Sequence, residues 1–251
     1  MHPELNERQQ QILEMLSREG EVRIRDLKEH FSVTEMTLRR DLEKMEQIGI
    51  LKRTFGGAIS VTQDVRKRSV KMIEEKIRIG RKAAESVQPG ESIFIDGGTT
   101  TLQVAKHLPA GIRITVVTNA LNVANVLLEK GIRTIVTGGI ALETTSTLVG
   151  PLAVEAISRM AFDRAFIGAT GCSVQHGFSN SDPYESELKS IVVERAVEAY
   201  IVIDHTKFGH RSLVSFADLS KVHGIYTDRL PEDEALLGAC KDAGVLLIEC
   251  E

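Results

Sequence analysis

The sequence predicts an α/β protein that begins with a small winged helix-turn-helix and continues as a mostly parallel, doubly wound sheet. Two observations predict it. The first sixty residues follow the order helix, helix, turn, helix, hairpin. From Glu75 onward, apolar strand-like runs alternate with helical stretches. We therefore place the winged helix-turn-helix at 1–59, a linker of low apolar content at 60–74 and the sheet domain at 75–251.

Each element of the N-terminal domain has its own signal. Apolar residues at helical spacing predict a first helix over 6–19 and a short second helix around Leu27. Thr34 is a good N-cap for a third helix that runs from Glu35 to about Ile48. Apolar pairs on either side of Phe55-Gly56-Gly57 then predict the hairpin that forms the wing.

The third helix has one apolar face and one charged face. At about 100° per residue, Arg40 and Gln47 lie opposite the core-facing side, and Lys44 flanks them. Arginine can donate two hydrogen bonds to guanine, glutamine can form two with adenine, and lysine can bind phosphate. An ordinary solvated helix also has a charged face opposite an apolar one, so the charged face alone does not establish DNA binding. The candidate DNA-binding residues are Thr34, Thr37, Arg39, Arg40, Lys44, Gln47 and Arg53.

Overall charge neither supports nor excludes a nucleic-acid partner. The chain of 251 residues has a formal net charge of −4. Residues 1–57 hold ten Lys and Arg against eleven Asp and Glu, a net charge of −1, and the basic residues cluster at 39–44 and 52–53. A locally positive face is enough for electrostatic binding to DNA.

Composition also bounds the location and the cofactors. No run of about 18 apolar residues is present, and the N-terminus is polar, so we expect neither a membrane span nor a signal peptide. The three cysteines are odd in number and form no C-x-x-C pair, which argues against a disulfide framework and against a cysteine zinc site. We expect a cytoplasmic protein without a cofactor or a metal ion.

Seven apolar, β-rich runs make up the predicted sheet, with helical stretches between most of them, for example Ala120–Lys130 and Tyr184–Ala199. The runs are Ser92–Ile95, Ile114–Val117, Thr134–Thr137, Ala165–Ile167, Tyr200–Ile203, Gly224–Tyr226 and Val245–Ile248.

Small polar residues follow three of these strands, in Asp96–Thr101, Thr118–Ala120 and Thr137–Gly139. Glycines allow close backbone approach, hydroxyls donate hydrogen bonds, and a helix N-terminus favours an anion. Because ligands of open α/β sheets bind beyond the carboxyl ends of the strands, these loops predict one crevice. Short turns without a ligand are the alternative for each loop taken singly. Neither G-x-G-x-x-G nor G-K-[ST] is present, which argues against a dinucleotide fold and a P-loop.

Charged residues later in the chain add to the predicted crevice. Glu185 and Lys189 share one helix face, although such a pair is most often a surface salt bridge. Lys207 follows the strand Tyr200–Ile203, where a lysine can bind phosphate. The candidate ligand-binding residues are Asp96, Gly98, Thr99, Thr100, Thr101, Asn119, Gly138, Gly139, Glu185, Lys189 and Lys207.

The stretch from Thr37 to Ala58, TLRRDLEKMEQIGILKRTFGGA, resembles the N-terminal signature of DeoR-type bacterial transcription regulators. That family usually shows T-[IL]-R-R-D-L, then L-E, G, R and G-G-A at fixed spacing. Phe55 departs from it, since the family often has histidine there, and this change can alter a contact of the wing. The resemblance implies DNA binding.

Segments of the second domain resemble the effector domain of the same regulators, among them Asp96–Thr101, Thr118-Asn119, Glu185 with Lys189, and Asp204–Gly209. The resemblance implies a fold similar to ribose-5-phosphate isomerase and a phosphorylated sugar or related metabolite as effector. It further implies that Thr99, Thr100 and Thr101 hold phosphate, with Asp96, Asn119, Glu185 and Lys207 near the sugar.

The resulting expectation is a repressor of a carbohydrate-metabolism operon, acting as a homodimer or homotetramer on operator DNA and released by its effector. The alternative is a sugar-phosphate isomerase with an added DNA-binding domain. Isomerases of the similar type carry acidic residues where this chain has Gly168–Gly171, which argues against turnover. A metal sensor built on His205 and His210 is a third possibility, but a trio of nearby ligands is lacking, and His107 and His176 are likewise expected at the surface.

Overall fold

The chain folds into two compact units, residues Met1–Arg68 and Ser69–Glu251. A computed structural model describes residues 5–19, 21–47, 51–54, 56–60 and 72–251. Most of the predicted linker, the end of the third helix at Ile48, and Phe55 of the wing therefore lie outside the described residues.

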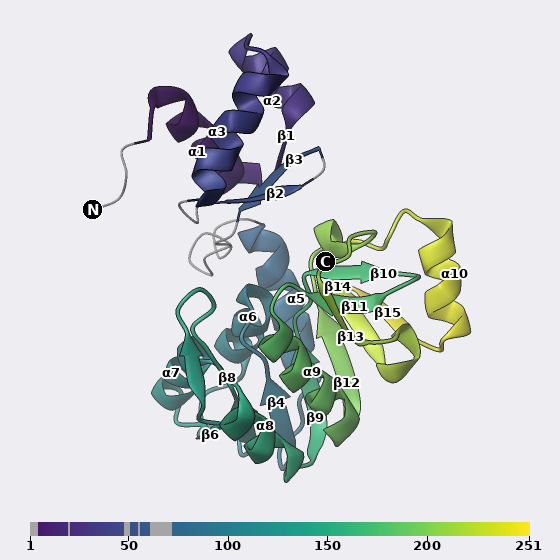
Figure 1. The fold of residues 1–251 in the computed structure, drawn as a ribbon. Coiled ribbons are helices and arrows are strands. Elements are labelled where there is room, and N and C mark those ends of the chain that lie inside the picture. The colour runs from purple at the N-terminus through teal and green to yellow at the C-terminus, as the bar shows by residue number, and fades with distance from the viewer. Residues whose placement is uncertain (1–4, 20, 48–50, 55, 61–71) are drawn as a thin grey trace. The chain divides into compact units, whose positions relative to one another are not determined.

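The described residues of the first unit form three helices and a small antiparallel sheet (Figure 1). Its strands pair in the order β1-β3-β2, so the hairpin of β2 and β3 is the wing and β1 lies beside it. Buried apolar side chains of all three helices, including Ile12, Leu27 and Leu38, form one core. This is the predicted winged helix-turn-helix. The elements are α1 (Glu7–Glu19), β1 (Glu21–Arg23), α2 (Ile24–Phe31), α3 (Glu35–Gln47), β2 (Leu51–Thr54) and β3 (Gly57–Ser60).

The second unit is built on a seven-stranded sheet with the order β15-β14-β12-β9-β4-β5-β6, in which every pair of neighbours is parallel. Each of the seven predicted strands lies in this sheet. The strands are β4 (Ser92–Ile95), β5 (Thr115–Thr118), β6 (Arg133–Val136), β9 (Phe162–Ile167), β12 (Ala196–Val202), β14 (Gly224–Thr227) and β15 (Leu246–Glu249).

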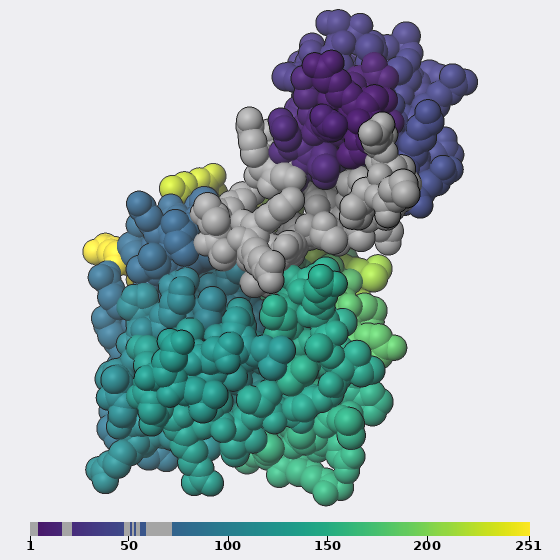
Figure 2. All heavy atoms as spheres, turned by 90° about the vertical axis from the view of Figure 1, so that its left-hand side faces the viewer, coloured from purple at the N-terminus to yellow at the C-terminus, as the bar shows by residue number. Residues whose placement is uncertain are grey.

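Helices cover both faces of this sheet, because its strands carry apolar residues on both sides. On β4, Ile93 and Ile95 pack with one set of helices and Phe94 packs with the other. The first set is α5 (Ile73–Glu85), α6 (Thr99–His107) and α7 (Leu121–Glu129), and the second set is α8 (Pro151–Ser158), α9 (Pro183–Arg195) and α10 (Glu234–Asp242). The face of the second unit that Figure 2 shows consists mainly of blue to green residues, and the yellow C-terminal residues show only at its margin.

Two antiparallel excursions interrupt the alternation, and sequence reasoning did not predict them. A hairpin of β7 (Ile140–Leu142) and β8 (Thr147–Val149) follows β6. A three-stranded sheet joins β10 (Gly171–Ser173), β11 (Gly177–Asn180) and β13 (Val214–Ala217). Short 3-10 turns, η1 (His205–Lys207) and η2 (Leu219–Lys221), follow β12 and β13.

One predicted boundary is wrong. The helix expected over Tyr184–Ala199 ends at Arg195, and β12 begins at Ala196. From that point side chains alternate between the two cores, with Ala199 and Ile201 on one face of the sheet and Tyr200 and Val202 on the other. Burial on both faces therefore overrides the helical pattern of the preceding turns.

Candidate functional site

The helix α3 begins at a threonine cap. The backbone N–H of Thr37 donates to Thr34 Oγ1 at 3.3 Å, and the two hydroxyls lie 2.9 Å apart. This geometry satisfies one of the free N–H groups at the helix start, as expected of an N-cap. Leu38, Leu42 and Met45 are fully buried beneath the helix.

Asp41 fixes α3 against α1, a role that the apolar pattern alone did not predict. Its carboxylate is 5% exposed and accepts from Arg8 Nε at 2.7 Å and from Gln9 Nε2 at 3.0 Å. A buried carboxylate with two donors orients the helix more strictly than apolar contacts do.

The outward face of α3 carries the exposed side chains of Arg40, Lys44 and Gln47, with the exposed carboxylate of Glu43 at its margin. Within the described residues none of the three forms a hydrogen bond or an ion pair. Two other predicted cations are already paired. Arg39 contacts Glu35 at 2.7 Å, and Arg53 contacts Glu46 at 2.7 Å.

The Arg53 pair also affects its ionisation. The hydrogen bond to the Glu46 side chain raises the pKa of the Arg53 guanidinium above its ordinary value, at which the group is already charged. Arg53 is positioned on the wing by this contact, whereas Arg40 and Lys44 are exposed on α3 and have no ion-pair partner among the described residues.

In the second unit the connections reverse direction between β4 and β9, which are neighbours in the sheet. The helix after β4 lies on one face, and the next helix after β9, α9, lies on the other. Loops that leave adjacent strands toward opposite faces open a crevice at the carboxyl ends of those strands. Asp96 follows β4 and Gly168 follows β9, so both lie at this point.

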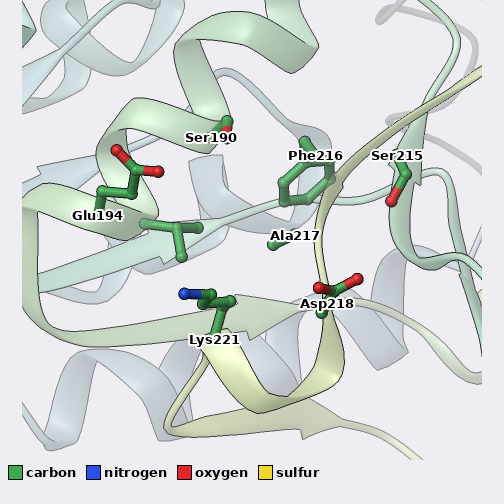
Figure 3. A pocket seen from close by; sticks show the side chains of 8 residues that line it. Ser190, Glu194, Ser215, Phe216, Ala217, Asp218 and Lys221 are labelled. Carbon is green, nitrogen blue, oxygen red and sulfur yellow. The ribbon is translucent and has the colours of Figure 1, made fainter.

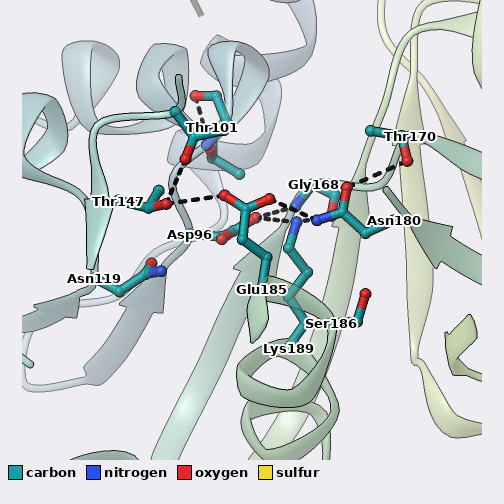
Figure 4. A network of polar contacts seen from close by, with 12 residues as sticks. Asp96, Thr101, Asn119, Thr147, Gly168, Thr170, Asn180, Glu185, Ser186 and Lys189 are labelled. Carbon is teal, nitrogen blue, oxygen red and sulfur yellow. Dashed lines mark hydrogen bonds and ion pairs between the residues drawn. The ribbon is translucent and has the colours of Figure 1, made fainter. Parts of the chain in front are cut away.

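Lys189 joins the two loops at the crevice. Its Nζ lies 2.8 Å from Asp96 Oδ2 and 2.7 Å from the carbonyl oxygen of Gly168 (Figure 4). The N–H of Gly168 also donates to Asp96 Oδ2, at 3.0 Å. The side chains of Lys189 and Asp96 are only 7% and 2% exposed. This buried ion pair therefore has additional hydrogen bonds, as a stable buried pair requires.

Glu185 projects from α9 toward the same crevice, one helical turn before Lys189, but the two do not pair with each other (Figure 4). Instead Thr147 Oγ1 donates to Glu185 Oε1 at 2.9 Å, and Asn180 Nδ2 donates to Oε2 at 2.8 Å. The carboxylate is 7% exposed. Sequence reasoning missed Thr147 and Asn180, because they come from the β7–β8 hairpin and β11.

The helix α9 reaches the crevice because of how it begins. Asp182 is its N-cap and accepts from the N–H groups of Tyr184 and Glu185, and Pro183 occupies the first helical position. This start places Glu185 in the first turn and Lys189 in the second, at the carboxyl edge of the sheet.

The threonines after β4 differ in their contacts. Thr101 Oγ1 donates to the carbonyl of Gly98 at 2.9 Å and accepts from the N–H of Gly98 at 2.6 Å, so this hydroxyl closes the first turn of α6. The hydroxyls and N–H groups of Thr99 and Thr100 have no hydrogen-bond partner among the described residues. The start of α6 therefore has donors available to an anion.

Asn119 adds an acceptor without a partner. Its Nδ2 donates to the carbonyl of Leu148 at 3.3 Å, but its Oδ1 is buried and lacks a donor within the described residues. A buried polar atom without a partner marks a place where a ligand or water completes the bonding.

The other predicted residues lie outside this cluster. Gly138 and Gly139 adopt positive φ in the β6–β7 loop, and a Cβ on Gly139 would lie 2.5 Å from the Val149 carbonyl oxygen. Among the described residues, no hydrogen bond joins either glycine to Asp96 or Glu185. Lys207 lies in η1 at the carboxyl end of β12 and is partly exposed.

Histidines do not gather into a metal site in the described part of the chain, where no three His, Cys, Asp or Glu side chains lie together as ligands would. His205 Nδ1 lies 2.6 Å from Asp228 Oδ2, and the backbone N–H of His205 donates to Asp228 Oδ1 at 2.8 Å. This pair ties η1 to the end of β14.

A separate groove runs between α9 and β13 (Figure 3). Phe216 lines it, and the ring centroid of Phe216 lies 5.7 Å from Lys189 Nζ. None of the sequence-predicted residues lines this groove. Its other lining residues are Ser190, Val193, Glu194, Ser215, Ala217, Asp218 and Lys221.

Comparison with known families covers both units. A family described as the DeoR-like helix-turn-helix domain matches residues 8–64, and one described as the DeoR C terminal sensor domain matches residues 71–229. The regulator YulB of Bacillus subtilis (strain 168), an HTH-type transcriptional regulator, is 36% identical over 228 residues, which is 88% of each chain.

The glycerol-3-phosphate regulon repressor of Escherichia coli (strain K12) is 35% identical over 225 residues, covering 88% of this chain and 89% of that protein. Among solved structures, ribose 5-phosphate isomerase A of Methanocaldococcus jannaschii aligns over 55% of each chain, with a TM-score of 0.42 and 14% identity. A similarity of that size does not imply a shared activity.

Proposed function

This chain belongs to the DeoR family of helix-turn-helix transcription regulators, and from that membership we propose that it represses a carbohydrate-metabolism operon until a phosphorylated sugar releases it. Two observations in one chain carry the proposal. Arg40 and Lys44 on α3 are exposed and have no ion-pair partner among the described residues. Buried polar side chains also gather where the order of the parallel sheet reverses. The repressor from Escherichia coli, whose name refers to a glycerol-3-phosphate regulon, supports a phosphorylated effector.

On the DNA side, α3 enters the major groove with Arg40, Lys44 and Gln47 toward the bases and the phosphates. Thr34 and Thr37 at the start of α3 contact the phosphate backbone of the DNA. Arg39 and Arg53, which are held by Glu35 and Glu46, serve as positioned cations beside phosphate. Two or four copies of the chain present their reading helices to repeated half-sites.

The test of this face uses Arg40→Ala with Arg39→Ala as its matched control. The operator is first selected from random-sequence DNA by the full-length protein. We expect Arg40→Ala to lose specific binding by about 1–3 kcal/mol, because a bidentate base contact is removed. Arg39→Ala should lose less, since Arg39 is already paired. Normal operator affinity of a folded Arg40→Ala protein, measured by fluorescence anisotropy, would refute the assignment.

On the effector side, the phosphate occupies the start of α6, where Thr99 and Thr100 offer hydroxyls and N–H groups. The helix N-terminus adds a partial positive charge. The sugar hydroxyls then reach the carboxylate of Glu185 and the Oδ1 of Asn119, which has no donor among the described residues; both groups are acceptors. Gly98 permits the close approach of the ligand to the backbone.

Charge explains why the phosphate is assigned to α6 rather than to Lys189. The ammonium of Lys189 is already neutralised by Asp96, and Glu185 adds a further negative charge nearby. A phosphate dianion bound to Lys189 would have to disrupt the buried Lys189–Asp96 ion pair. That costs more free energy than binding at the start of α6, where the phosphate meets donors without a partner among the described residues. Lys207, at the neighbouring strand end, supplies a cation at the margin of the crevice.

We further propose that this crevice binds its ligand without converting it. Isomerisation requires a carboxylate base together with a second acid or amine. The Gly168–Gly171 turn contains no carboxylate, and both oxygens of Glu185 accept hydrogen bonds from the protein. Effector binding instead shifts the protein between two states of different operator affinity.

A thermal-shift screen of phosphorylated sugars, polyols and their unphosphorylated counterparts tests the effector, because a specific ligand raises the melting temperature by mass action. In Thr100→Val, affinity for the compound identified should fall about ten- to a hundredfold, since a hydrogen bond to a charged group contributes about 1.5–3 kcal/mol. Operator binding without the compound should be unchanged.

Two outcomes would contradict the effector proposal. One is equal affinity for the unphosphorylated compound, measured by titration calorimetry. The other is conversion of a bound aldose phosphate to its ketose, which would make Glu185 a working base and support the isomerase alternative.

A further inference from the structure

Met36 is an exposed apolar side chain on the face of α3 that otherwise carries polar groups. It is the second residue of the helix, and its side chain is 64% exposed. Arg40 follows four residues later, and residues at that spacing lie side by side on one helix face. Leu38, Leu42 and Met45 occupy the opposite, buried face.

Neighbouring groups on the same turn have partners. The hydroxyl of Thr37 contacts the hydroxyl of Thr34, and Arg39 pairs with Glu35. Met36 belongs to none of these contacts and lies outside the apolar core of the unit. A single exposed apolar residue is ordinary on a protein surface. Met36, however, lies in the first turn of α3, and in helix-turn-helix proteins the N-terminal residues of the recognition helix contact base edges.

We propose that Met36 reads the C5-methyl group of a thymine in the operator. The methyl of thymine is the apolar group that the major groove presents, and apolar side chains recognise it by contact. This inference rests on the proposed DNA-reading face of α3 and adds to it the base that Met36 selects.

The helix geometry places this thymine relative to the base that Arg40 contacts. Four residues of α-helix rise about 6 Å, and successive base pairs are about 3.4 Å apart. Met36 and Arg40 therefore contact positions one or two base pairs apart. The expected half-site contains a thymine at that distance from the guanine read by Arg40.

The experiment replaces thymine by uracil, which removes the methyl and leaves every hydrogen-bonding group in place. An operator is selected from random-sequence DNA with the full-length protein, and each thymine is then replaced singly. For the unaltered protein we expect one position per half-site at which uracil weakens binding about fourfold, the effect of one methyl-sized apolar contact.

Three variants make the result specific. Met36→Ala should bind the thymine and uracil operators equally at that position. Met36→Leu, which keeps an apolar contact, should retain most of the discrimination. Arg40→Ala should bind more weakly overall yet preserve the thymine-to-uracil ratio. Circular dichroism verifies that each variant is folded, as expected for an exposed position.

The outcomes separate this inference from the proposal beneath it. If operator binding is specific and depends on Arg40, but Met36→Ala keeps the full uracil penalty at every thymine, the inference on Met36 is overturned alone. The same holds if the unaltered protein is insensitive to every uracil. If no sequence is enriched at all, the DNA-reading proposal fails together with the inference.

Discussion

Replacing Lys189 by methionine should destabilise the second unit strongly. Methionine keeps much of the length of the side chain and its packing beside Phe216, but it removes the ammonium that lies 2.8 Å from Asp96 Oδ2. The Asp96 carboxylate, 2% exposed, would then retain one described donor, the N–H of Gly168. Breaking a buried ion pair in this way costs about 3–5 kcal/mol. In a domain of this size each kcal/mol lowers the melting temperature by about 2–4 °C, so we expect a decrease of about 6–20 °C.

Differential scanning calorimetry of the full-length protein measures this change. Lys82→Met is the matched control, because Lys82 is 54% exposed and lies 3.7 Å from Glu85 in a surface pair worth about 0–1 kcal/mol. Adding Asp96→Asn to Lys189→Met should recover more than half of the loss, since no charge is then buried without a partner. A decrease below about 2 °C for Lys189→Met, or a double variant no more stable than the single one, would refute this view of the crevice.

Two further predictions concern the second unit. Gly138→Ala should lower the free energy of unfolding by about 1–2 kcal/mol, because the backbone there has a positive φ. Gly139→Ala should lower it further, because the new Cβ would also lie 2.5 Å from a backbone oxygen. Equal losses of unfolding free energy for the two variants in urea denaturation would contradict this contrast. Burial raises the pKa of Cys172 to about 12 and that of Cys250 to about 11. A thiol reagent at pH 8 should therefore leave both unlabelled in the native protein and label both in urea, because the thiolate is the reactive form; rapid native labelling would show that these thiols are accessible.

Much of the fold was predictable because local patterns and burial agree in it. All seven strands of the parallel sheet appear in the sequence as short apolar runs. In the inner strands, burial on both faces requires apolar residues at successive positions, whereas the edge strands β6 and β15 leave several of theirs exposed. Thr34 was recognisable as the cap of α3, and its hydroxyl does accept from the helix N-terminus. The β7–β8 hairpin and the β10-β11-β13 sheet were not predicted. The strands β7, β8 and β10 have only three residues each, too few to show a period, and β11 contains one large apolar residue, Phe178.

Membrane spanning is a similar case of a local property. Within the described residues, none of the helices combines the length and the apolar character needed to cross a bilayer.

The candidate crevice was predictable in its location but not in its contacts. Asp96, Asn119 and Glu185 could be identified because they follow strands or begin a helix in an α/β pattern. The spacing of Glu185 and Lys189 suggested a salt bridge between them, yet each bonds to a different element of the fold. Spacing along one helix identifies which side chains share a face, and it contains no information on what that face meets.

The sequence by itself determined the fold classes of the two domains and the family, and it supplied the candidate residues for DNA and anion binding, because these depend on periodicity, caps and motif spacing. Tertiary structure alone decided which of those groups are already engaged. Arg39, Arg53 and Thr101 have partners, whereas Arg40, Thr99 and Thr100 have none among the residues that the structure describes. The Lys189–Asp96 pair joins residues 93 positions apart. Such pairing follows from how strands are ordered in the sheet, and that order is set by packing across the whole domain rather than by any local stretch of chain.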